Sequence, residues 1–203
     1  MIKSAVTVAL VPQIKSGPWI FWERLEEAMA KAENLGFDAI ELFTPDARSL
    51  DQEELAAALK MHDLKLAAVG TGAGKVIHGL TLTDPNPEIR KKAISFISEM
   101  ISFGAKFQAP AIIGSMQGNV IPGKDRDLTL SWLEEALGIL GTQAEKEGVF
   151  LIYEPLNRYE TNLFNTIGSG AKFLESLNTK NVKLLADLFH MNIEEEDIAK
   201  SII

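Results

Sequence analysis

VFLIYE, residues 149–154, is an apolar run that ends in a carboxylate, and VKLLAD, residues 182–187, repeats this pattern further along the chain. AIIGS, residues 111–115, is a third short run of β-branched and other apolar residues. All three runs are nearly continuous in hydrophobicity rather than alternating, which is typical of parallel strands covered by helices. They predict an α/β protein with a parallel sheet.

Strand-like and helix-like segments alternate along the whole chain. We predict strands at residues 5–11, 38–43, 65–69, 109–115, 150–154 and 183–187, and helices at 21–35, 52–61, 87–103, 128–146 and 168–177. Asn86 followed by Pro87 predicts the start of one of these helices, and Gly104 predicts its end. This alternation builds right-handed βαβ units, which a doubly wound sheet and a closed barrel both contain.

The length of the chain bears on its organisation. No linker or break in composition divides it, so we expect residues 1–203 to form a single domain. A closed barrel of eight βα units usually needs about 250 residues. If the fold is a barrel, this chain covers about six of the eight units, and we expect the C-terminal units to be missing.

Composition argues against several classes of protein. The net charge of −8 gives no general attraction for nucleic acid or for anionic membranes. The absence of cysteine removes disulfides, Cys-ligated zinc and thiol nucleophiles. No run approaches the about 20 apolar residues that span a bilayer, and we interpret residues 5–11 as a strand rather than a signal peptide. We therefore expect a cytoplasmic protein.

Two carboxylates follow neighbouring predicted strands. Glu154 ends the fifth strand and Asp187 ends the sixth, with His190 three residues further on. Side chains at the same height on adjacent parallel strands lie about 5 Å apart, and two carboxylates there repel unless a cation lies between them or one is protonated. A divalent metal ion satisfies both, and His190 is available as a ligand or a hydrogen-bond donor. The alternatives are an ion pair of Glu154 with a Lys or Arg at the barrel rim, and a His190 that only bonds to backbone.

Two long motifs contain these residues: EPLNRYETNLFNT, residues 154–166, and ADLFHMNIEEEDI, residues 186–198. They resemble the metal-dependent sugar isomerases and epimerases with the xylose isomerase-like barrel, and most of all the D-tagatose 3-epimerase and hydroxypyruvate isomerase group. GFDAIEL (36–42), VGTGAGK (69–75) and APAIIGSMQG (109–118) agree more loosely. The resemblance implies a (β/α)8 TIM barrel.

The resemblance also implies roles for individual residues. Glu154 would be a metal ligand and an acid/base group, and Asp187 a second metal ligand. His190 and Glu160 would contact the substrate. The remaining ligands of that family, a His after strand seven and a Glu on strand eight, would lie beyond Ile203, as would a substrate-binding Arg.

The chemistry that the resemblance implies is proton abstraction next to a carbonyl, through a metal-stabilised enediolate. The enzyme would be a ketose 3-epimerase or an aldose–ketose isomerase acting on a sugar or sugar phosphate. Mn²⁺ or Co²⁺ is the expected metal, with Mg²⁺ or Zn²⁺ as alternatives. Barrels of this kind commonly form homo-oligomers.

Several weaker candidates lie near the expected barrel mouth. Gln117 closes strand four and is predicted to hydrogen-bond substrate, and Trp19 is predicted to stack on a sugar. His78 lies in the long segment after strand three and is a further substrate-binding candidate. Residues 70–75, GTGAGK, resemble a phosphate loop but lack the Walker spacing, so we predict a flexible loop with Lys75 as the possible phosphate contact. Glu41 interrupts an apolar strand and is predicted to point into the barrel in a buried, hydrogen-bonded role.

Two other functions remain open from the sequence. One is a metallonuclease resembling endonuclease IV, which uses a related barrel but holds three metal ions with many histidines, whereas this chain has three His in total. The other is a barrel that binds sugar without turning it over.

Overall fold

The computed structural model describes residues 2–14, 17 and 19–202. The strands are β1 (Ala5–Ala9), β2 (Ala39–Phe43), β3 (Lys65–Gly70), β4 (Ala111–Ile113), β5 (Leu151–Tyr153) and β6 (Val182–Leu184). The helices are α1 (Leu25–Asn34), α2 (Gln52–Met61), α3 (Ala73–His78), α4 (Pro87–Ala105), α5 (Arg126–Lys146), α6 (Ile167–Ser176), α7 (Leu188–Glu194) and α8 (Ile198–Ile202), with a 3₁₀ turn η1 (Ser115–Gln117).

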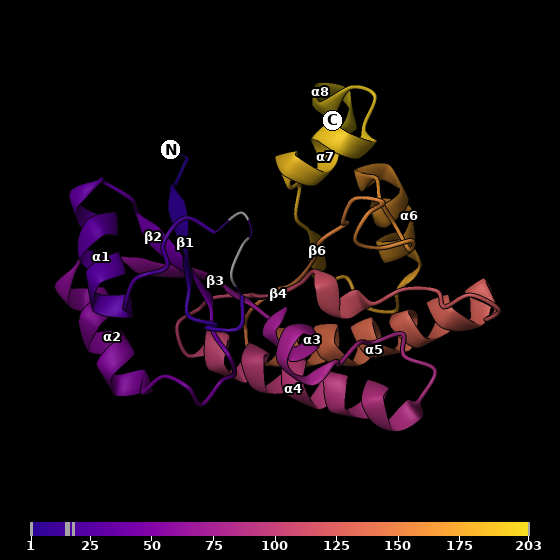
Figure 1. The fold of residues 1–203 in the computed structure, drawn as a ribbon, viewed down its shortest axis with the longest axis horizontal. Helices are drawn as coiled ribbons and strands as arrows, with labels where there is room; N and C mark the ends of the chain where they lie inside the picture. The colour runs from indigo at the N-terminus through magenta and orange to yellow at the C-terminus, as the bar shows by residue number, and fades with distance from the viewer. Residues whose placement is uncertain (1, 15–16, 18, 203) are drawn as a thin grey trace.

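The six strands form one parallel sheet in the order β1-β2-β3-β4-β5-β6. A doubly wound sheet would reverse its strand order at one point, whereas a barrel adds each strand beside the one before it. The helices α1, α2, α4, α5 and α6 follow the outer side of the curved sheet (Figure 1). The chain is therefore a partial (β/α)8 barrel of six units. The predicted fold class is confirmed, and the doubly wound alternative is removed.

Side chains on the outer side of the strands build the core. One buried cluster joins β1, β2 and β3 to α1 and α2 and includes Val8, Ile40 and Met29. A second cluster joins β4, β5 and β6 to α4 and α5 and includes Ile113 and Leu137. Burial of these apolar side chains is the dominant favourable contribution to folding.

The opposite faces of the same strands point into the barrel. Successive side chains along a strand alternate between its two sides, so the neighbours of Val8 and Ile113, which are Thr7 and Ile112, face inward. Thr7 is in register with Glu41 on β2, and Glu41 also faces inward. Alternation thus collects the inward side chains into a cavity that the helices do not fill.

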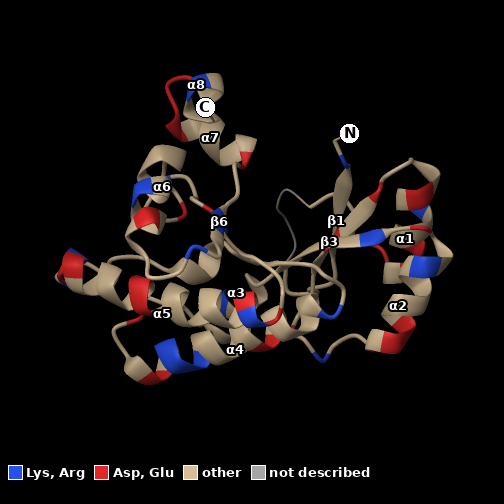
Figure 2. Ribbon diagram, turned by 180° about the vertical axis from the view of Figure 1, so that it is seen from behind, with Lys and Arg blue, Asp and Glu red and all other residues tan. Residues whose placement is uncertain are grey.

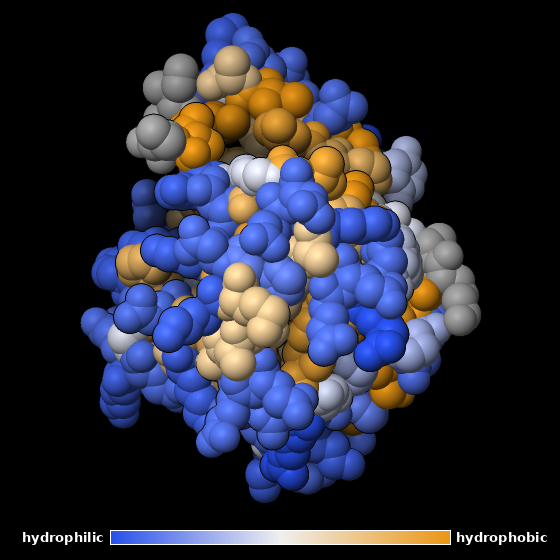
Figure 3. Space-filling model, turned by 90° about the vertical axis from the view of Figure 1, so that its left-hand side faces the viewer, coloured by the Kyte–Doolittle hydropathy of each residue, from blue (hydrophilic) through white to orange (hydrophobic). Residues whose placement is uncertain are grey.

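Charged and hydrophobic residues are unevenly distributed over the molecule. Charged residues lie mainly on the helices, and most of the strand ribbon carries none (Figure 2). The face over α1 and α2 is largely hydrophilic, with hydrophobic residues gathered at the upper end of the view (Figure 3). Within the described part of the chain, no helix combines the length and hydrophobicity needed to cross a membrane.

Several predicted boundaries differ from the structure. Strand β1 ends at Ala9 and not at residue 11, and β4 covers Ala111–Ile113 and not 109–115. Strand β6 ends at Leu184 and not at residue 187, so Asp187 lies three residues beyond the strand that it was predicted to end. The first helix begins at Leu25 instead of residue 21, because the backbone of Phe21 pairs with β1: the Ala9 N–H donates to the Phe21 carbonyl at 2.8 Å. The helix that starts at Pro87 continues past Gly104 to Ala105. Helix α7 begins directly after Asp187, where no helix was predicted.

The glycine-rich segment after β3 is also different from its prediction, because it forms helix α3 and not a flexible loop. Thr71 is buried and its hydroxyl donates to the Ile112 carbonyl at 2.8 Å. A Cβ on Gly74 would lie 2.6 Å from Sδ of Met116 and 2.9 Å from Cδ1 of Phe96. The absence of a Cβ at Gly74 allows close packing of α3 against these side chains.

This packing explanation predicts the effect of filling the space at Gly74. Gly74→Ala should lower the free energy of unfolding by about 1–3 kcal/mol, the usual cost of overpacking, as measured by urea denaturation. Gly138→Ala is the matched control, since Gly138 lies in α5 with no atom within 4 Å of its added Cβ and should be neutral or stabilising. A Gly74→Ala protein as stable as the wild type would contradict the explanation.

Candidate active site

A cavity of about 430 Å³ lies at the carboxyl ends of the strands. This is the end at which (β/α)8 barrels carry their functional groups. Every strand, or the segment directly after it, contributes to the lining: Thr7, Trp19, Glu41, Phe43, Gly70, Thr71, Gly72, Ile112, Gly114, Ser115, Glu154, Leu156, Glu160, Leu185, Asp187, Phe189 and His190. The volume is that of a small-molecule site.

Glu154 is held at the end of β5 by its backbone. Its N–H donates to the Ile113 carbonyl at 3.0 Å, and its carbonyl accepts from Nε2 of Gln117 at 2.9 Å. The side chain is 15% exposed. A Cβ on Gly114 would lie 2.5 Å from Oε2 of Glu154, so a glycine at this point of the neighbouring chain segment leaves room for the carboxylate. The main chain therefore directs Glu154 into the cavity.

Asp187 is the N-cap of α7. Its Oδ1 accepts from the Phe189 N–H at 2.7 Å, which satisfies one of the free donors at the helix start. This bond fixes the carboxylate, and Oδ2 lies 4.0 Å from Nε2 of His190. His190 lies three residues later, on the same side of the helix, and is buried.

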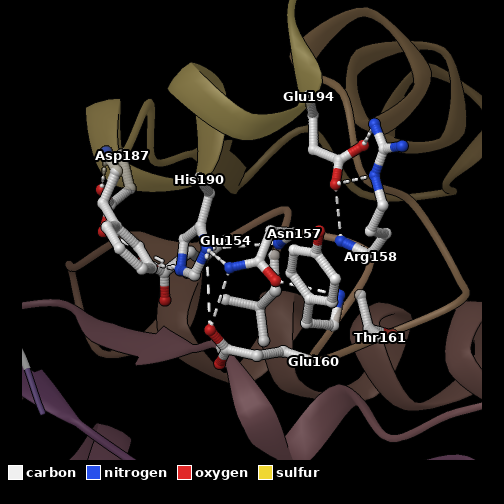
Figure 4. Close-up of polar contacts among 12 residues, drawn as sticks. Glu154, Asn157, Arg158, Glu160, Thr161, Asp187, His190 and Glu194 are labelled. Atoms are coloured by element: carbon white, nitrogen blue, oxygen red, sulfur yellow. Dashed lines mark hydrogen bonds and ion pairs between the residues drawn. The ribbon is translucent and has the colours of Figure 1, made fainter.

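The two carboxylates converge as the sequence predicted. Nε2 of His190 lies 3.9 Å from Oε1 of Glu154, and one ligand atom from each of Glu154, Asp187 and His190 lies within 4.8 Å of the other two. Figure 4 shows the three side chains meeting from the end of β5 and the start of α7. Among residues 2–14, 17 and 19–202, no Lys or Arg pairs with Glu154, which removes the alternative of an ion pair at the rim for this part of the chain.

A third carboxylate lies nearby. Glu41 on β2 lines the same cavity, and its Oε1 accepts from the Thr7 hydroxyl at 3.3 Å, in agreement with the predicted inward, hydrogen-bonded position. Burial, with a smaller effect from Asp187, raises the pKa of Glu41 above its usual value. Burial, followed by repulsion from Asp187, raises the pKa of Glu154 to about 8.

The donor set of this cluster fits a divalent cation. The residues described as lining the cavity include several carboxylates and neither Lys nor Arg. Carboxylate oxygens are the ligands of hard divalent ions, and such an ion would relieve the repulsion that raises the pKa of Glu154. Glu154 and Asp187 are the residues that would hold it.

Asn157 is a site residue that the sequence did not single out. It is 2% exposed, and its amide Nδ2 lies 2.8 Å from Nδ1 of His190 and 3.1 Å from Oε1 of Glu160 (Figure 4). The available signal was its position between the two glutamates of EPLNRYE. Beside it, Arg158 pairs with Glu194 at 2.9 Å and connects this segment to α7.

The weaker candidates lie in different surroundings. Trp19 lines the cavity, with its ring edge against Phe43 at 5.0 Å between centroids. Gln117 is fully buried, donates to the Gly114 and Glu154 carbonyls and accepts from the Tyr153 hydroxyl, so it braces the strand ends from behind. His78 is exposed at the end of α3 and outside the cavity lining. The structure brings Trp19 and Glu160 into the cavity, and it does not bring Gln117 or His78 there.

These features define a parallel α/β barrel with an acidic cluster at its mouth. Residues 29–203 match the xylose isomerase-like TIM barrel family, and the chain belongs to this family.

The chain is similar in sequence to several sugar epimerases. The chain is 30% identical over 198 residues to a D-psicose 3-epimerase from Ruminiclostridium cellulolyticum, covering 91% of this chain and 66% of that protein. It is 26% identical to a probable ketose 3-epimerase from Synechocystis, covering 95% of this chain and 69% of that protein. The crystal structure of D-psicose 3-epimerase with D-tagatose from Clostridium cellulolyticum superimposes with a TM-score of 0.80 at 26% identity, covering 99% of this chain and 68% of that one. The chain thus spans about two thirds of the length of these relatives.

Proposed function

We propose that this protein is a divalent-metal-dependent sugar epimerase or isomerase, most specifically a ketose 3-epimerase. The observation that carries the proposal is the convergence of Glu154, Asp187 and His190 at the barrel mouth. The names of the relatives supply the reaction class. The substrate is a small ketose or its phosphate, and Mn²⁺ or Co²⁺ is the proposed metal.

Each residue has a definite task in this proposal. The Glu154 carboxylate removes the proton from the carbon next to the substrate carbonyl as a positioned general base. When bound by Glu154 and Asp187, the cation supplies Lewis-acid polarisation of the carbonyl. His190 and Glu160 hold substrate oxygens, and Trp19 covers an apolar face of the sugar.

Exchange of a substrate proton with solvent tests the proposal, because this exchange requires only one general base. A ketose incubated with the chain in D₂O and Mn²⁺ should gain deuterium next to the carbonyl, because removal of the proton by Glu154 and its replacement from solvent suffice. D-Tagatose and D-psicose, free and phosphorylated, are suitable probes. Deuterium at C-3 indicates an epimerase, and deuterium at C-1 indicates an isomerase.

Removal of the metal should abolish this exchange. We expect EDTA to lower the exchange rate at least about 10²-fold, since a Lewis acid contributes several kcal/mol to such steps, and Mn²⁺ or Co²⁺ to restore it. The rate is measured by proton NMR. Exchange that is insensitive to EDTA would contradict the proposal. Metal and sugar binding without exchange would indicate the non-catalytic barrel, and salt-sensitive binding to abasic duplex DNA would indicate the nuclease.

A further inference from the structure

The orientation of the Asn157 amide is determined by its backbone neighbour. The Tyr159 N–H donates to Oδ1 of Asn157 at 3.0 Å. A backbone N–H can only donate, so the oxygen of the amide must face Tyr159. The other amide atom, Nδ2, therefore faces Nδ1 of His190 and Oε1 of Glu160.

Nδ1 of His190 consequently meets two donors. The Asn157 side-chain Nδ2 lies at 2.8 Å and the Asn157 backbone N–H at 3.2 Å. The Glu160 oxygen is 3.8 Å from Nδ1, beyond hydrogen-bond distance. A proton on Nδ1 would point at other protons, and it would leave the backbone N–H and one of the two amide protons of Asn157 without an acceptor. The lone pair is therefore on Nδ1, and in the neutral ring the proton is on Nε2.

Nε2 is the ring nitrogen that faces the carboxylates. It lies 3.9 Å from Oε1 of Glu154 and 4.0 Å from Oδ2 of Asp187, too far for a hydrogen bond to either. An N–H in this position can donate to a ligand oxygen held between the ring and the carboxylates. It has no lone pair to offer a cation, although its distance from the two carboxylates alone would suit a third metal ligand.

We propose that Asn157 is a positioning residue that fixes the tautomer of His190, so that the histidine presents an N–H to the substrate and does not ligate the metal. The same amide joins Glu160 to the histidine, so one buried side chain sets the orientation of both substrate-contacting groups. The role in catalysis rests on the proposed function, whereas the tautomer is a property of the chain alone.

Nitrogen NMR of the histidine rings tests the inference directly. The chain contains only three histidines, so ¹⁵N-histidine labelling gives a simple long-range ¹H–¹⁵N spectrum. In the spectrum of the neutral ring, His190 should show an unprotonated Nδ1 and a protonated Nε2. His62 is an internal reference for the opposite tautomer, since its Nδ1 lies 2.7 Å from Oε2 of Glu33. The exposed His78 should show a mixture.

Two matched variants separate the effect of the amide from general disturbance of the loop. Asn157→Asp keeps the oxygen that accepts from Tyr159 but replaces the donor with an acceptor, so the proton of His190 should move to Nδ1 or both nitrogens should be protonated. Asn165→Asp alters another amide of the same loop, whose Nδ2 donates to the Leu156 and Thr161 carbonyls, and should leave the His190 pattern unchanged.

Each outcome decides the question. A wild-type His190 protonated on Nδ1 would overturn the inference without any variant, and so would an Asn157→Asp protein with the wild-type pattern. If Asn157→Asp does not fold, Asn157→Ala retains the backbone donor, and its His190 should show a mixed tautomer. Loss of sugar exchange with the expected tautomer intact would count against the proposed function only.

Discussion

Glu154→Gln should lower the rate of metal-dependent proton exchange by about 10²–10⁴-fold, the usual contribution of a positioned general base. The amide has nearly the shape of the carboxylate but cannot accept the substrate proton. The variant also loses one of the two proposed metal ligands, so exchange is compared at saturating Mn²⁺. The measurement is deuterium incorporation next to the ketose carbonyl by NMR.

Two control variants make this result specific. Glu134→Gln removes a charge from the exposed surface of α5 and should leave exchange unchanged. Glu160→Gln alters a cavity residue that is proposed only to hold substrate, so it should mainly raise the sugar concentration needed for half-maximal rate. Full activity in Glu154→Gln would remove the general base from the proposal and with it the epimerase chemistry.

The strands and most helices follow from local sequence. LIY of VFLIYE and VKL of VKLLAD form β5 and β6, because short continuous apolar runs suit a sheet that helices cover. Asn86 caps α4 with its side chain on the Glu88 N–H, as its position before Pro87 indicated. The order of the strands was not available from this pattern, because the same βαβ unit builds both a wound sheet and a barrel. Only the pairing of each strand with its successor separates them.

The site residues likewise include some that local sequence predicts and others that it does not. The rim position of Glu154 was predictable because parallel strands place their carboxyl ends at one rim. Asp187 reaches the same rim in a way that was not predicted, as the N-cap of α7 three residues after β6. The position of Gln117 was not predictable, because its burial depends on the Tyr153 hydroxyl and on carbonyls distant in sequence. The tautomer of His190 depends on Asn157, which contacts it across 33 residues of chain. Such contacts exist only once the loops have folded against each other.

The stability of the metal-free protein should fall as pH rises from about 5 to about 8. The pKa of Glu154 is about 8 in the folded chain, against an ordinary value of 4.5, because the group is buried beside Asp187. Between these two pH values the unfolded chain has released this proton while the folded chain retains it. The unfolded state therefore binds fewer protons, and the free energy of unfolding decreases with pH. The contribution is fully present below pH 4.5 and is lost by the time the pH passes 8.

The size of this effect is set by the difference in pKa. Each pKa unit corresponds to about 1.4 kcal/mol, so the stability lost over the difference between 4.5 and about 8 is on the order of 5 kcal/mol. For a chain of this length that is a fall of about 10 °C in melting temperature. Glu154→Gln should flatten the profile and melt higher than the wild type at pH 8, because the amide is never charged. Glu134→Gln should follow the wild type.

Divalent cations should reverse the loss, because they bind the charged form of the site in the folded chain alone. Thermal unfolding in EDTA, and then with Mn²⁺ or Mg²⁺, measures both effects from pH 5 to pH 9. Asp38, whose pKa is lowered to about 2 by Lys3 and Ser4, contributes only in acid and lies outside this window. Two results would contradict this prediction: a flat wild-type profile in EDTA, or a Glu154→Gln protein that melts lower than the wild type at pH 8. Either would show that an ionised Glu154 does not destabilise the folded chain. The cluster would then have no electrostatic need for a metal.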